Sequence, residues 1–161
     1  MRISNPEEIE TVFSMFHDGT IIKLYLKDGD VYMEIDICYL AERVNPKFEN
    51  FTVKITKPSK LQIELWNDEA KVITDLKEIE QLKLGILSCE RTIGSIFKIA
   101  CTTDFEQSSG GSLSFTTTSI EVFDEIKKAY SFQELLHLAN GYWEDWIEES
   151  CQQIPKVKRH S

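Results

Sequence analysis

His17 and Asp18 are the residues whose types and spacing come nearest to catalytic chemistry. They stand in the segment His17-Asp18-Gly19, between a predicted helix and a predicted strand. A carboxylate beside an imidazole can orient a general base or support a metal ligand. Adjacent side chains seldom point the same way, however, and a histidine metal site needs further ligands that the spacing does not supply. We therefore favour a capped turn, in which Asp18 bonds backbone N–H groups and Gly19 supplies positive φ.

Other catalytic patterns are missing from the sequence. It has no G-x-S-x-G elbow, and the glycine-rich segment Ser109-Gly110-Gly111 lacks the Gly-Lys-Ser/Thr ending of a phosphate-binding loop. The cysteines are widely separated and form no C-x-x-C motif: Cys38, Cys89, Cys101 and Cys151. The sequence thus predicts a protein with no catalytic residues, no metal and no cofactor, which is not an enzyme.

An acidic and aromatic run near the C-terminus is the strongest candidate for a binding surface. At 100° per residue, Trp143, Trp146 and Ile147 continue a buried helical stripe. The carboxylates of the run spread round the other side: Glu144, Asp145, Glu148 and Glu149. We call these four residues the acidic ridge and predict that it docks a cationic protein surface.

The charge of the chain agrees with a basic protein partner. The formal net charge is −9 over 161 residues. Such a body repels nucleic acid and anionic membranes and accelerates encounter with a basic protein, although simple solubility is the alternative explanation. No apolar run approaches membrane-spanning length, and no secretory signal opens the chain. We expect a cytoplasmic protein with reduced thiols.

The stretch Thr20–Leu40 predicts a β-hairpin that positions an aromatic pair. Asp28-Gly29 fits a two-residue turn with positive φ at both positions. The resulting register places three apolar pairs on one face: Leu26 with Val31, Leu24 with Met33 and Ile22 with Ile35. On the other face Tyr25 meets Tyr32, and we predict that these two tyrosines contact the partner.

The remaining elements predict an α+β fold. Asn5 caps a short N-terminal helix, and residues 51–56 and 61–65 form a second hairpin. Ser131 and Glu134 form a capping box for a C-terminal helix. We predict a twisted antiparallel sheet or open barrel of about six to eight strands, built from hairpins, with the C-terminal helix packed on it. Residues 1–153 are a single domain, and residues 154–161 are a basic disordered tail.

Residues 16–40 resemble a group of small bacterial domains. The resemblance rests on Phe16-His17-Asp18-Gly19-Thr-Ile-Ile, on the Asp-Gly hairpin and on Cys38-Tyr39-Leu40. Several such groups are similar to immunity proteins of polymorphic toxin systems. The resemblance implies a stoichiometric, acidic, non-enzymatic inhibitor of a toxin, often a basic nuclease, and it carries over no site residue.

Three functional hypotheses follow from the sequence. The first is a non-enzymatic binding module that neutralises a basic protein partner through acidic and aromatic surface. The second is a small-molecule-binding or hydrolytic domain that uses the interior of a half-open barrel, with His17 at its mouth. The third is a structural subunit whose exposed sheet edges pair in a homodimer.

Overall fold

A computed structural model describes residues 1–67, 71–103 and 110–142 of the chain. The three labelled helices are short: α1 (Pro6–Met15), α2 (Cys38–Ala41) and α3 (Leu76–Gln81). A further helix begins at residue 132 and continues to residue 142, where the description ends. Among the described helices, none combines the length and the apolar character needed to cross a membrane.

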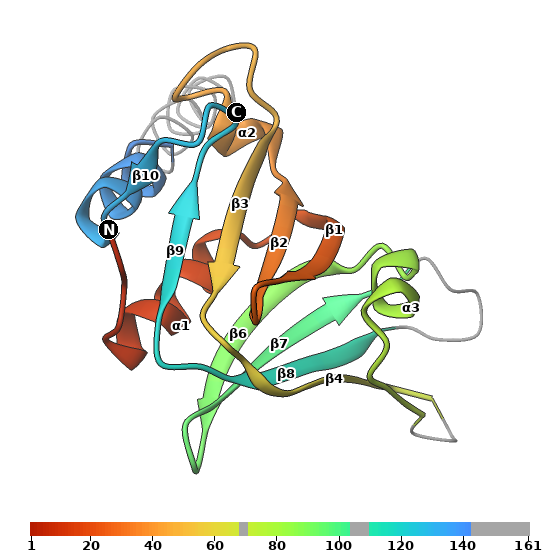
Figure 1. Cartoon of the computed structure of the whole chain (residues 1–161). Helices are drawn as coiled ribbons and strands as arrows, with labels where there is room; N and C mark the ends of the chain where they lie inside the picture. Colours follow the sequence, from red (N-terminus) through yellow and green to blue (C-terminus); the bar gives the residue numbers. More distant parts are fainter. Residues whose placement is uncertain (68–70, 104–109, 143–161) are drawn as a thin grey trace, which may run out of the picture.

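Ten strands form one open antiparallel sheet, in the order β10-β9-β3-β2-β1-β6-β7-β8-β4-β5 (Figure 1). In chain order the strands are β1 (Thr20–Lys27), β2 (Asp30–Asp36), β3 (Asn50–Ile55), β4 (Ser59–Leu65), β5 (Val72–Ile73), β6 (Gly85–Thr92), β7 (Ile96–Thr102), β8 (Gly111–Thr116), β9 (Ile120–Phe123) and β10 (Ala129–Tyr130). The predicted α+β class and antiparallel sheet are confirmed. The strand count exceeds the expected six to eight, because residues 111–122 divide into β8 and β9 and because the two-residue strand β10 is added.

The sheet consists of two halves that separate between β1 and β6. These two strands pair only at Thr20 and Gly85. Figure 1 shows β9, β3 and β2 running side by side, while β6, β7, β8 and β4 cross below them at a steep angle. The chain passes between the halves twice, and Thr56 and Ser119 hold the two passages together through a backbone hydrogen bond of 3.0 Å and a hydroxyl contact of 2.8 Å.

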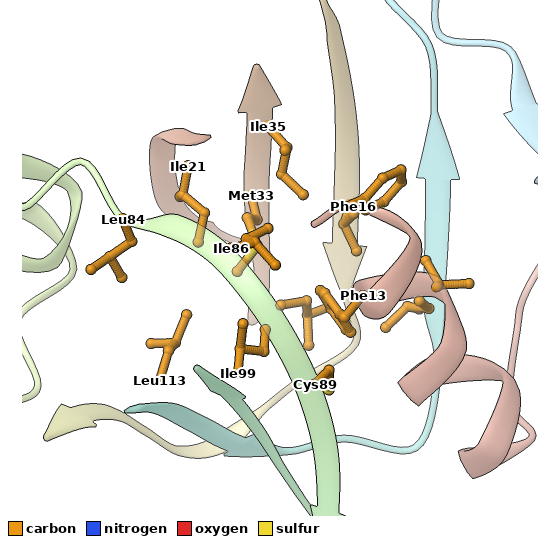
Figure 2. Packing of buried hydrophobic residues seen from close by; sticks show 14 of the residues in the cluster. Phe13, Phe16, Ile21, Met33, Ile35, Leu84, Ile86, Cys89, Ile99 and Leu113 are labelled. Carbon is orange, nitrogen blue, oxygen red and sulfur yellow. The ribbon is translucent and has the colours of Figure 1, made fainter. Parts of the chain in front are cut away.

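The hydrophobic core fills the space between the two halves and extends onto α1. Figure 2 shows side chains from β1, β2, β6, β7 and β8 converging on the same region. Phe13 of α1 contacts Phe115 of β8 at a centroid distance of 5.6 Å, and Phe16 stacks on Phe51 of β3 at 5.7 Å. One short helix therefore ties both halves together, which explains why Ile9, Val12, Phe13 and Phe16 are fully buried.

The first hairpin has the predicted register over most of its length. Leu24 pairs with Met33, Tyr25 with Tyr32 and Leu26 with Val31. A bulge between Ile21 and Lys23 then shifts the register, so that Ile21 rather than Ile22 pairs with Ile35. The predicted burial of Leu26 is wrong: its side chain is 64% exposed because β1 has left the packed region there.

The predicted second hairpin does not form. β3 pairs with β2 on one side and with β9 on the other, whereas β4 pairs with β8 and β5. Lys57 and Lys60 both have positive φ, and the chain turns there from one half of the sheet into the other. Local alternation identified both strands correctly, but each strand has one partner from a distant part of the chain, β9 for β3 and β8 for β4.

The C-terminal helix begins with the predicted capping box. Ser131 Oγ accepts from the Glu134 backbone N–H at 3.1 Å, and the Glu134 carboxylate accepts from the Ser131 N–H at 3.0 Å. The bond from the Ser131 N–H stabilises the Glu134 carboxylate and is the main reason that the pKa of Glu134 is lowered. Leu135 and Ala139 of this helix are buried in the main core. The tail predicted at residues 154–161 lies outside the described part of the chain.

Candidate functional site

Tyr25 and Tyr32 form a stacked pair on the outer face of the first half-sheet. The strand alternation that buries Leu24 and Met33 turns these two tyrosines to the opposite face. Their ring centroids are 5.3 Å apart and the ring planes differ by 5°. Tyr25 remains 43% exposed and Tyr32 is half-buried, so the pair presents aromatic surface to solvent.

Lys54 lies beside Tyr32 on the neighbouring strand β3, so Tyr25, Tyr32 and Lys54 form a row across the sheet. It pairs with Tyr32 in the β2–β3 register and with Glu121 in the β3–β9 register. Its ammonium lies 3.7 Å from an Asp30 carboxylate oxygen and 3.6 Å from one of Glu121. Tyr32 and these two carboxylates raise the pKa of Lys54, which keeps the ammonium charged beside the tyrosine pair.

A second row of residues, Glu34, Thr52 and Phe123, runs across the sheet beside the row of Tyr25, Tyr32 and Lys54. Glu34 on β2 lies 3.9 Å from the Lys23 ammonium and accepts a 3.0 Å hydrogen bond from the Asn50 amide. Thr52 on β3 follows, and Phe123 on β9 pairs with Thr52. The two rows together make a surface of aromatic rings and paired charges.

A groove of about 290 Å³ runs over this surface from β1 to the β9–β10 turn. We call it the outer groove, and its lining residues come from five elements or turns: Tyr25, Lys27, Tyr32, Thr52, Lys54, Phe123, Asp124 and Lys127. Lys27 and Lys127 make no ion pair within the described residues. The groove therefore offers apolar ring surface for contact and ammonium groups for hydrogen bonding or charge pairing.

Asp124 shapes one wall of the outer groove. Its side chain is 3% exposed, and Oδ1 accepts hydrogen bonds of 3.0 Å from the backbone N–H groups of Ile126 and Lys128. The other oxygen accepts a 2.7 Å bond from the Tyr130 phenol. These bonds fix the tight β9–β10 turn, in which Lys127 adopts φ 65. Both oxygens of the Asp124 carboxylate are thus occupied by hydrogen bonds within the chain, and the carboxylate is not available to a ligand.

His17 and Asp18 do approach one another, contrary to the expectation for neighbours in sequence. His17 Nδ1 lies 3.3 Å from an Asp18 carboxylate oxygen, and the Asp18 side chain is 76% exposed. Asp18, rather than Gly19, adopts the positive φ, at 69°. Gly19 is needed for space instead, because a Cβ there would lie 2.8 Å from the Ile35 side chain. The chain does turn here, but the positive φ predicted for Gly19 occurs at Asp18, and the Asp18 carboxylate contacts the His17 ring.

The surroundings of His17 are aromatic and hydrogen-bonded. The Tyr39 phenol donates to the His17 backbone carbonyl, and the two rings lie 6.5 Å apart. Tyr39 in turn contacts Tyr142 at a centroid distance of 4.6 Å. Among the residues that the structure describes, no group of three or more His, Cys, Asp and Glu side chains is arranged to hold a metal ion.

Comparisons with models of protein families, with curated proteins and with solved structures found no match. The proposed function consequently rests on the sequence and the geometry of this chain.

The structure describes some of the predicted site residues and not others. Tyr25 and Tyr32 are brought together as predicted, and they lie beside the outer groove. The acidic ridge, Glu144, Asp145, Glu148 and Glu149, lies outside the described residues. Sequence reasoning missed Phe123 and Lys127, which join the groove from a strand and a turn about a hundred residues further along the chain. The only local signal for them is the alternation in residues 120–123.

Proposed function

We propose that this chain is a non-enzymatic module that binds a protein partner through the outer groove and its tyrosine pair. Tyr25 and Tyr32 are the central contacts, and Phe123 extends the aromatic surface. Lysines at the groove contribute hydrogen bonds and charge pairing at its margins.

One observation carries this proposal, namely the stacked tyrosine pair on a solvent-facing strand surface. Two rings held 5.3 Å apart by the hairpin register lose little conformational freedom when a partner covers them. Tyrosine is enriched among the residues that dominate binding energy at protein interfaces, because it combines a large apolar body with a polar hydroxyl. Tyr25 at 43% exposure is available for such contact.

The overall charge supports a basic partner, and the widely separated cysteines support a cytoplasmic location for the complex. A net charge of −9, which includes the four carboxylates of the acidic ridge, increases the rate of encounter with a positively charged protein. The resemblance of residues 16–40 to immunity-type domains supports a toxin as the partner and stoichiometric inhibition as the outcome.

The test begins with purification of the chain from native cell extract and identification of proteins that accompany it in stoichiometric amount. The affinity of that partner is then measured for the double variant Tyr25→Ala/Tyr32→Ala. We expect Kd to rise by at least about thirtyfold, since two tyrosines that each contribute more than about 1 kcal/mol together contribute more than about 2 kcal/mol.

Trp66→Ala is the matched control, because Trp66 is 44% exposed and lies directly after β4 in the other half of the sheet. Its Kd should stay within about threefold of the wild-type value, as is usual for a residue outside the contact. Failure of any protein to co-purify, or equal effects of the double variant and the control, would count against the proposal.

A second candidate function is hydrolysis or small-molecule binding centred on His17. The 3.3 Å contact between His17 Nδ1 and the Asp18 carboxylate favours it, since such a contact can orient an imidazole base. If a hydrolytic activity is found, His17→Ala should lower its kcat by about a hundredfold or more while the fold survives. Under the binding-module proposal, His17→Ala leaves partner affinity unchanged.

A further inference from the structure

One edge of β1 is left without a neighbouring strand where the two half-sheets separate. The Ile21 N–H still donates to the Leu84 carbonyl at 2.8 Å, close to the single Thr20–Gly85 pair. After the bulge at Ile22, β1 continues to Lys27 with β2 as its only strand partner in the described part of the chain. Figure 1 shows α3, rather than another strand, beside this part of β1.

The backbone groups of Leu24 and Leu26 point toward this open edge. The two-residue turn makes Lys27–Asp30 the first hydrogen-bonded pair, so bonded pairs recur at Tyr25–Tyr32 and Lys23–Glu34. Leu24 and Leu26 alternate with them and direct their N–H and C=O groups away from β2. The structure agrees, because the Leu24 N–H donates to a Glu80 carboxylate oxygen of α3 at 2.9 Å. A side-chain oxygen thus occupies the position that a strand carbonyl would take.

A second groove follows this edge between β1 and α3. Its volume is about 520 Å³, and we call it the edge groove; its lining residues are Leu24, Tyr25, Leu26, Leu76, Lys77, Glu80 and Gln81. Leu26 is 64% exposed and Tyr25 is 43% exposed, so large apolar side chains stand beside backbone groups of β1 that pair with no other strand in the described part of the chain. This combination of a free edge and apolar surface suits an extended peptide.

We propose that the edge groove binds an extended segment of a partner protein, with alternating apolar and acidic side chains, as an additional strand on β1. The acidic preference follows from Lys77 in the groove lining and from Lys23 and Lys27, which alternate with Leu24 and Leu26 on β1 and would face the side chains of an added strand. Glu80 is the one acidic residue of the lining, and the Leu24 N–H that it accepts from is the group that the added strand would bond. Opposite charges in cross-strand positions are favourable, and like charges are not. A second copy of this chain is therefore disfavoured, because antiparallel β1–β1 pairing would bring its lysines opposite one another.

This proposal rests on the proposed function and deepens it, since it states how part of a protein partner is held. Backbone hydrogen bonds to Leu24 and Leu26 would supply affinity, and contact with the exposed Leu26 and Tyr25 would supply selectivity. A backbone carbonyl of the added strand replaces the Glu80 carboxylate as the acceptor of the Leu24 N–H. A partner that is basic overall can still present a short acidic strand at this position.

The test uses the full chain and the synthetic peptide Ac-Val-Asp-Val-Asp-Val-Asp-NH2 in a calorimetric titration. We expect binding with Kd below about 1 mM. Leu26→Pro removes the outward N–H without touching a β1–β2 hydrogen bond, so the strand should tolerate it while peptide affinity falls at least about tenfold. Leu26→Val keeps the N–H and an apolar side chain, and its Kd should change by less than about threefold.

Amide hydrogen exchange gives an independent measurement on the wild-type chain, in case Leu26→Pro unfolds. The Leu26 amide should exchange at least about tenfold more slowly when peptide is bound. The proposal is overturned by a Kd above about 1 mM, by equal losses in Leu26→Pro and Leu26→Val, by an unprotected Leu26 amide, or by equal binding of the lysine peptide Ac-Val-Lys-Val-Lys-Val-Lys-NH2. A Kd above about 1 mM would indicate that Glu80 and the lysines only shield the edge from aggregation, whereas equal binding of the lysine peptide would show that the edge has no acidic preference.

The edge proposal and the binding-module proposal can fail separately. If a partner co-purifies and loses affinity in the tyrosine double variant but not in Leu26→Pro, the outer groove is the contact and the edge is not. If the peptide binds but no partner co-purifies, the edge is a strand acceptor and the proposed function is wrong. Peptide-independent dimerisation of the chain through β1 would contradict the edge proposal.

Discussion

The phenol of Tyr130 donates a 2.7 Å hydrogen bond to the carboxylate of Asp124, and both side chains are buried. The same carboxylate accepts from two backbone N–H groups of the β9–β10 turn. Three donors therefore converge on one buried side chain, and this arrangement holds the wall of the outer groove.

Removal of the Asp124 carboxylate should destabilise the fold. Asp124→Ala leaves two N–H groups and a buried phenol without an acceptor, so we expect a loss of about 3 kcal/mol in the free energy of unfolding. Asp124→Asn keeps the Oδ1 acceptor, and its loss should be about 1 kcal/mol. Urea denaturation measures the free energy of unfolding of both variants. Equal losses would show that the charge matters more than the acceptor geometry.

The stability of the fold should decline in alkaline solution because of Tyr130. Burial and the bond to Asp124 raise the pKa of Tyr130, so the phenol stays protonated in the folded state when it ionises in the unfolded chain. A raised pKa of this kind contributes stability that is complete below the unfolded value of about 10 and is lost as pH rises above it.

Unfolding free energies measured from pH 8 to pH 11 test this prediction. The wild-type chain should lose more stability over that range than Tyr130→Phe, which has no phenol to ionise. Identical slopes for the two proteins would exclude the Tyr130 phenol as the cause.

Two leucines on the same strand should respond very differently to truncation. Leu24 is 1% exposed and Leu26 is 64% exposed. Leu24→Ala should cost about 3 kcal/mol of stability through the cavity it leaves. Leu26→Ala should change stability by less than about 0.5 kcal/mol. Similar losses in chemical denaturation would mean that β1 packs against the core as far as its turn.

Gly19 should be intolerant of a side chain for steric reasons. An added Cβ would lie 2.8 Å from Ile35 Cγ2 and 2.9 Å from the Phe16 carbonyl oxygen. We expect Gly19→Ala to cost about 1–3 kcal/mol, as overpacking in a close contact does. Gly94→Asn is the control, because open space surrounds that position and asparagine tolerates its positive φ of 88°. In thermal unfolding, Gly19→Ala should have a clearly lower Tm than Gly94→Asn.

Cysteine alkylation should follow burial. Cys38 is exposed, whereas burial raises the pKa of both Cys89 and Cys101 to about 12. Because the thiolate is the reactive species, iodoacetamide at pH 8 should label Cys38 well before the other two. Peptide mass spectrometry at several time points measures the order. Rapid labelling of Cys101 would mean that β7 opens in the native state.

Local patterns in the sequence predicted the elements that local chemistry controls. Asp28-Gly29 determines the turn of the first hairpin, since both residues adopt positive φ there. The register near that turn follows directly, and it places Tyr25 against Tyr32. Asn5 and Ser131 act as helix caps because their side chains need only backbone N–H groups two or three residues away.

The tertiary structure decided everything that depends on distant pairing. β3 lies between β2 and β9, and β4 pairs with β8, and in this arrangement the apolar faces of both half-sheets and of α1 share one core. The bulge at Ile22 and the separation of β1 from β6 arise where the two halves diverge. Alternation shows which side chains share a face of a strand, but it carries no information about the neighbouring strand. For that reason the sequence alone determined the tyrosine pair, whereas only the folded chain brought Phe123 and Lys127 to its groove and left the β1 edge open.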